Sequence, residues 1–154
     1  MDSAMMISLC KIGGAAAFGL SATGSALGSG VAAMAAIGAW KRCYAQGKMA
    51  PFMVVAFMAA PLSQTFYGMI VMNSIVAAAT AGAHHAALIA AGLFGGVAIG
   101  ISAWYQGKAA AAACDAFGET GQGFGNYMIA LGVIETVAIL VLVFIGKVIQ
   151  VAAG

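Results

Sequence analysis

Residues 125–151 read GNYMIALGVIETVAILVLVFIGKVIQV, and this stretch decides the fold. Its only charged residues are Glu135 and Lys147, and most of the others are apolar. A helix that crosses the hydrocarbon core of a bilayer needs about 20 such residues. The stretch therefore predicts a transmembrane helix with one carboxylate near its middle.

Three further stretches satisfy the same criterion, at residues 12–40, 51–80 and 86–116. The chain of 154 residues is 64% hydrophobic and 6% charged, with a mean hydropathy of +1.04, which is outside the range of soluble domains. Its net charge of +2 is too small and too scattered to indicate a nucleic-acid partner. We expect an all-α, multi-pass integral membrane protein whose main environment is the lipid bilayer.

The two halves of the chain are related in sequence. Residues 25–33, SALGSGVAA, align with residues 102–110, SAWYQGKAA, and residues 63–65, SQT, align with residues 134–136, IET. The pattern predicts a duplicated helical hairpin, with one copy at 1–80 and the other at 81–154. One copy has the carboxylate Glu135 where the other has Gln64.

Polar connections at 41–48 and 118–123 separate the two helices of each hairpin, and residues 81–85 join the hairpins. The first connection holds three of the six basic residues, so the positive-inside rule places the hairpin loops in the cytoplasm. Both termini and residues 81–85 then lie on the extracytoplasmic side. The stretches 12–40 and 86–116 are rich in small residues, which let helices approach closely. We expect these two to be packing helices.

Glu135 is the candidate functional residue, because an ionised carboxylate at mid-membrane costs several kcal/mol unless it has a proton, a cation or a partner. Gln64 and Gln106 fall at a similar distance from the hairpin loops, roughly 15–20 Å deep at 1.5 Å per residue. The alternative is that these side chains only form hydrogen bonds between helices. Their common depth favours one site near the midplane.

Ser63, Gln64 and Tyr67 share a helix face, which adds a hydroxyl and a phenol to this site. Pro61 removes a backbone hydrogen bond, so a carbonyl oxygen near Ala60 can turn toward a ligand. A proton needs only the carboxylate and one hydrogen-bond partner. A hydroxyl, two amide oxygens and a carbonyl oxygen are better suited to a dehydrated alkali cation.

Residues 60–68, APLSQTFYG, together with Gln106-Gly107-Lys108 and Glu135-Thr136, resemble the proteolipid K subunit of vacuolar/archaeal-type rotary ATPases, particularly its sodium-translocating members. The resemblance covers nearly the whole chain. It implies that one Na⁺ per protomer is bound by the following residues: Glu135, Gln106, Gln64, Ser63 and the carbonyl of Ala60. It also implies that Tyr67 donates a hydrogen bond to the glutamate. Ser63 stands where threonine is usual, and Leu62 and Thr65 stand where glycine is usual.

The resemblance implies a rotor-ring subunit of a V/A-type rotary ATPase or ATP synthase, which is itself not catalytic. Its expected partners are further copies of the chain, a membrane stator subunit with a cationic residue, and central stalk subunits. Gly107-Lys108 is not a phosphate-binding loop, because Ser102 and Ala109 replace the glycine and hydroxyl residue that such a loop requires. Nucleotide chemistry therefore belongs to other subunits.

Two alternatives remain open at this point. A ring of the same fold could carry H⁺ in place of Na⁺, and a small four-helix proton-coupled drug antiporter also depends on one membrane glutamate. The hairpin duplication and the amide of Gln64 disfavour the antiporter. Lys108 has two possible roles, because its amine can extend toward the cytoplasmic side or face the interior of the ring.

Overall fold

The computed structural model describes residues 3–154, which are mostly helical and contain no strand. The elements are α1 (Ser3–Ala45), α2 (Val54–Ala59), the 3₁₀ turn η1 (Ala60–Leu62), α3 (Ser63–Thr80), α4 (His85–Thr120) and α5 (Phe124–Ala152). Four segments are long and apolar enough to cross a membrane, with α2, η1 and α3 together forming the second. The predicted all-α fold with four transmembrane helices is confirmed.

The predicted helix boundaries are less accurate. The helices expected at 12–40 and 86–116 extend further at both ends. An apolar stretch marks only the part of a helix that lies in the hydrocarbon core, and the helix can continue beyond it. Parts of the expected loops at 41–48 and 118–123 are therefore helical. The helix expected at 51–80 begins at Val54, whereas 125–151 agrees with α5 to within one residue at each end. The division into hairpins at 1–80 and 81–154 stays a prediction, and its first two residues lie outside the described part of the chain.

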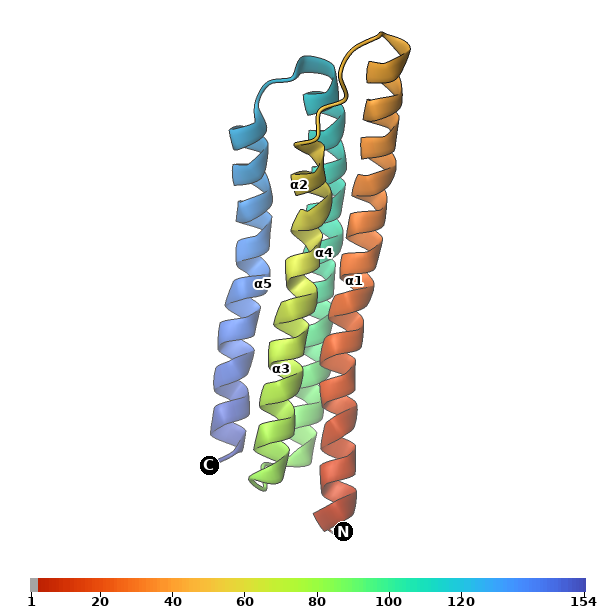
Figure 1. Cartoon of the computed structure of the whole chain (residues 1–154). Coiled ribbons are helices and arrows are strands. Elements are labelled where there is room, and N and C mark those ends of the chain that lie inside the picture. Colours follow the sequence, from red (N-terminus) through yellow and green to blue (C-terminus); the bar gives the residue numbers. More distant parts are fainter. Residues whose placement is uncertain (1–2) are drawn as a thin grey trace.

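The four long segments lie side by side, with α1 and α5 on opposite sides of the bundle and α3 and α4 between them (Figure 1). Both α1 and α5 pack against α3 and α4. The two termini and the turn between α3 and α4 lie at one end, and the other two connections lie at the opposite end (Figure 1). At the first end the backbone N–H of His84 donates to the carbonyl of Ala152, with 3.4 Å between the two atoms. Which end faces the cytoplasm stays a prediction.

Helices α1 and α4 are in contact through their backbones. Gly24 meets the backbone of Gly100, and Gly107 meets that of Gly28, so a Cβ atom at either position would overlap the opposite main chain. Glycine is needed at these positions for close approach rather than for an unusual backbone conformation. The packing expected for the two helices rich in small residues is thus present within a single protomer.

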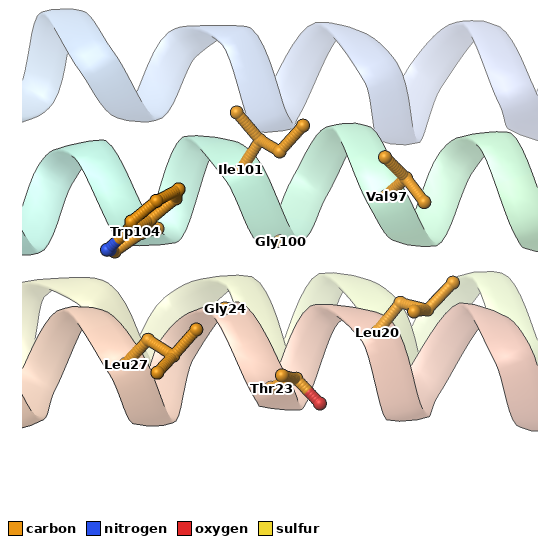
Figure 2. A pocket seen from close by; sticks show the side chains of 8 residues that line it. All are labelled: Leu20, Thr23, Gly24, Leu27, Val97, Gly100, Ile101 and Trp104. Carbon is orange, nitrogen blue, oxygen red and sulfur yellow. The ribbon is translucent and has the colours of Figure 1, made fainter.

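Figure 2 shows a shallow groove over this backbone contact, on the outer surface of α1 and α4. It is lined by Leu20, Thr23, Gly24, Leu27, Val97, Gly100, Ile101 and Trp104. The only side-chain hydroxyl among them belongs to Thr23, which donates to the carbonyl of Gly19 in its own helix at 2.8 Å. The groove is therefore an apolar surface without a charged group.

The apolar core forms two clusters, which are separated along the helices by a polar layer. The first includes Val71 and Ile99, and the second includes Phe57 and Leu131. In the second cluster the ring centroids of Phe57 and Phe124 are 5.2 Å apart. The residues of the predicted site lie between the two clusters, with Gln64 on α3, Gln106 on α4 and Glu135 on α5.

Candidate ion-binding site

The 3₁₀ turn η1 interrupts the second span where Pro61 lacks a backbone N–H. The backbone N–H of Ser63 donates to the carbonyl of Ala60, and the Ser63 hydroxyl donates to the same oxygen at 3.0 Å. The Ala60 oxygen is thus turned toward the Ser63 side chain. From the sequence we expected this oxygen to be available to a ligand, but in the structure it already accepts hydrogen bonds from Ser63. A cation would therefore have to share this oxygen with Ser63 or displace the hydroxyl.

A chain of hydrogen bonds connects Ser63 to Gln106. The Ser63 hydroxyl lies 3.1 Å from Oε1 of Gln64 and shares its single proton between that oxygen and the Ala60 carbonyl. Nε2 of Gln64 donates to Oε1 of Gln106 at 2.8 Å. Both glutamine side chains are completely buried, with 0% of their surface exposed. Buried amides are costly unless their polar atoms are paired, so this bond fixes α3 against α4 at the level of the site.

Glu135 is the acceptor at which these contacts converge. The Tyr67 hydroxyl donates to one carboxylate oxygen of Glu135 at 2.7 Å, and Nε2 of Gln106 lies 3.5 Å from the other. The first is a short bond and the second a long one. Glu135 itself is partly buried. Its ion-pair partners would have to be basic residues, and within residues 3–154 the ion pairs involve only Arg42 with Asp115 and Glu119.

The structure therefore places all the predicted site side chains within one connected group. Gln106, Gln64 and Tyr67 join Glu135 through direct bonds or one intervening amide, and Ser63 joins them through Gln64. Ala60 is connected only through Ser63. Carbonyl and hydroxyl oxygens have more than one acceptor position, so these atoms can contact a cation while keeping a hydrogen bond. The group offers one carboxylate and several neutral oxygens, a set that suits a proton or a small hard cation.

Ser102 is a member of this region that the sequence analysis did not assign to the site. Its hydroxyl donates to the backbone carbonyl of Ile134 at 3.0 Å, directly before Glu135 in the chain. One turn further along α4, Nε2 of Gln106 donates to the carbonyl of Leu131 at 3.0 Å. The spacing of four residues, which puts Ser102 and Gln106 on one helix face, was a signal available in the sequence.

Lys108 does not reach the carboxylate. Its amine lies 4.2 Å from the ring centroid of Trp104 and 4.9 Å from that of Tyr105, and the residue is exposed on the surface of the protomer. A cation over an aromatic face is attracted by the ring quadrupole. This contact is a role that the sequence analysis did not consider for Lys108, and it leaves both earlier alternatives untested.

Comparison with known proteins adds one finding. Residues 89–145 match the family of the C subunit of ATP synthase. No curated protein matches the chain significantly. The matched segment lies within the hairpin of α4 and α5 and contains both Gln106 and Glu135. The match supports a rotor-ring subunit of a rotary ATP synthase or ATPase, and it falls on the half of the chain that carries the membrane carboxylate.

Proposed function

We propose that the chain is a rotor-ring subunit of a V/A-type rotary ATPase or ATP synthase, and that each protomer binds and carries one Na⁺ at Glu135. The observation that carries this proposal is the position of Glu135. It lies near the middle of an apolar span and accepts a hydrogen bond from Tyr67, while its other oxygen faces Gln106. The match of residues 89–145 to the C subunit of ATP synthase supports the rotor role.

The buried glutamines favour Na⁺ over H⁺ as the transported ion. A protonated carboxyl would be satisfied by Tyr67 and a single further partner, and it would not require two fully buried amides. The oxygens of Ser63, Gln64 and Gln106 supply the neutral ligands that a dehydrated alkali cation needs. The proton-carrying ring of the same fold is the alternative that the experiment below separates.

Charge neutralisation gives the mechanism. With Na⁺ bound, the single negative charge of Glu135 is balanced and the site can face lipid. After release the carboxylate is costly in an apolar environment, so it has to stay near water or near a cationic group of a stator subunit. Each elementary charge that crosses 100 mV exchanges about 2.3 kcal/mol with the field, and several ions per turn add up to the work of nucleotide chemistry in other subunits.

The assembly proposed here is a closed homo-oligomeric ring in the lipid bilayer, with the hairpin loops in the cytoplasm against a central stalk. At that end of the bundle Arg42 of α1 forms an ion pair with Asp115 of α4, and its guanidinium lies 3.8 Å from Glu119. These contacts tie α1 to α4 at the surface that would face the stalk. Exposed ion pairs contribute little stability, so their value here is in defining the shape of this surface.

Carbodiimide labelling tests the choice of ion. Carbodiimides react with protonated carboxyl groups, and a cation bound to Glu135 competes with that proton. We expect NaCl to slow the labelling of Glu135 in the purified, detergent-solubilised protein at fixed pH and ionic strength, and KCl to have much less effect. Mass spectrometry of the peptides assigns the label to individual carboxylates.

Glu119 provides an internal control within the same sample. Its side chain is 61% exposed and lies outside the Glu135 site, so sodium should leave its labelling unchanged. Labelling of Glu135 that responds to pH but is indifferent to sodium over a wide concentration range would replace the sodium proposal with the proton alternative. A carboxylate at 135 that never reacts, while Glu119 does, would contradict the ion-carrying role itself.

A further inference from the structure

Two side chains of α4 hold the backbone of α5 next to Glu135. The hydroxyl of Ser102 donates to the carbonyl of Ile134, and the amide of Gln106 donates to the carbonyl of Leu131, each at 3.0 Å. Ser102 is only 6% exposed and Gln106 is fully buried. The two bonds are one turn apart, so together they fix both the height and the rotation of α5 at the level of the carboxylate.

The first hairpin has no such pair of bonds in the part of the chain that the structure describes. Ser25, which aligns with Ser102, is 2% exposed, yet its hydroxyl has no hydrogen-bond partner. Ser29, which aligns with Gln106, donates to the carbonyl of Ser25 within α1 at 2.6 Å. The aligned helix of that hairpin is broken at η1, whereas α5 is continuous. The bonds between side chain and backbone are therefore specific to the hairpin with the carboxylate.

We propose that Ser102 is a positioning residue for the ion site, which acts by fixing the rotation of α5 and thereby the place of Glu135. This inference rests on the proposed function of Glu135. Helix side chains reach about 5–6 Å from the helix axis, so a rotation of about 20° would move the carboxylate by roughly 2 Å. The bond from Tyr67 at 2.7 Å and the contact with Gln106 at 3.5 Å would not both survive that displacement.

Few side chains of α5 are fully buried, so these bonds add directional constraints to its apolar packing. Those that are buried within the protomer are Leu131, Ala138 and Ile149. Apolar packing is not directional and permits small rotations, whereas hydrogen bonds to named carbonyls do not. Ser102 thus adds a directional contact to an apolar packing that also includes the partly buried Val141, Leu142 and Ile145 of α5.

The test compares Ser102→Ala with its matched control Ser25→Ala in the assembled protein. Both changes remove a buried hydroxyl from a glycine-rich helix, but only Ser102→Ala removes a bond between helices. The carbonyl of Ile134 keeps the backbone bond of its own helix, so Ser102→Ala leaves no unpaired acceptor and should fold. A cooperative melting transition and retained assembly in both variants would verify this.

The first readout is the infrared carboxyl band of Glu135, identified by its absence in Glu135→Gln. At one fixed pH and sodium concentration its frequency reports hydrogen bonding to the carboxyl group, so the variants can be compared whether Glu135 is protonated or ionised. We expect Ser102→Ala to shift or broaden this band in the same direction as Tyr67→Phe, and Ser25→Ala to leave it unchanged. A band in Ser102→Ala that is identical to the band in Ser25→Ala would overturn the proposal.

The second readout is the sodium concentration that half-protects Glu135 from carbodiimide. We expect Ser102→Ala to raise it about three- to tenfold, the effect of one neutral hydrogen bond, and Ser25→Ala to leave it within about twofold. If sodium fails to protect the unmodified protein, the sodium assignment is wrong, while the infrared comparison still decides the role of Ser102. If sodium protects all three proteins equally, Ser102 does not position the site.

Discussion

The bond between Gln64 and Gln106 makes a double-mutant cycle the sharpest test of the ion site. Nε2 of Gln64 donates to Oε1 of Gln106 at 2.8 Å, and both side chains are fully buried. Gln106→Ala removes an oxygen that we assign to the cation, and it also leaves the Gln64 amide without its partner. Removing one partner of a buried hydrogen bond costs about 1–3 kcal/mol.

Each single variant, Gln64→Ala or Gln106→Ala, should therefore raise the sodium concentration needed for half-protection of Glu135. A loss of about 1–3 kcal/mol in sodium binding corresponds to roughly a 5- to 150-fold change. The double variant should lose less sodium-binding free energy than the two single variants lose together, because removing both amides leaves neither one unpaired. For side chains in direct contact the difference is expected to be about 0.5–3 kcal/mol.

The assay is sodium protection of Glu135 from carbodiimide, measured for all four members of the cycle at one pH and ionic strength. Gln150→Ala is the matched control, because Gln150 is an exposed glutamine at the end of α5 outside the hydrogen-bonded group. Its protection curve should coincide with that of the unmodified protein. Strictly additive losses would refute the coupling between the two amides, and unchanged protection in both single variants would refute their role as ligands.

The remaining predictions concern transport, packing and topology. Glu135→Gln should abolish coupled ion transport in reconstituted complexes while the ring still assembles, since an amide cannot gain and lose a charge; retained transport would contradict the assignment. Gly107→Ala should destabilise the protein by about 1–3 kcal/mol, because the new Cβ would overlap the backbone of Gly28, whereas Gly30→Ala, which meets open space, should be close to neutral in thermal unfolding. Gln46→Cys, in a variant without the native cysteines, should react with an impermeant thiol reagent only from the cytoplasmic side; labelling from outside intact cells would reverse the topology.

The fold could be predicted from the sequence because lipid imposes a simple rule on a chain of this composition. Each apolar stretch of sufficient length must form a helix that satisfies its own backbone, so the number and type of elements follow from hydropathy. Hydropathy did not predict the ends of α1 and α4, because both helices continue beyond the apolar stretches at 12–40 and 86–116. Hydropathy reports the solvent of a residue, whereas helix ends depend on caps and turns.

The candidate site was predicted in its members but not in its connections. A common depth was enough to group Gln64, Gln106 and Glu135, since polar residues at mid-membrane require partners. Depth gives no information about rotation, however, so it could not show that Ser102 faces the backbone of α5. Nor could it show that the Ala60 oxygen is engaged by Ser63, because that contact depends on the turn geometry of η1.

The contact between α1 and α4 has a mechanical consequence. Where glycine lies against glycine, as at Gly24 and Gly100, no flexible side chain separates the two main chains. Close packing of this kind makes the two helices resist bending and sliding as one unit. Helix α5 is the softer member, since it buries few side chains and is joined to α4 near Glu135 through Ser102 and Gln106. The protomer is thus stiffer along α1 and α4 than along α5. A force applied along the direction of rotation would deform α5, next to the carboxylate, more than it deforms the α1–α4 pair, and that pair would transmit the torque.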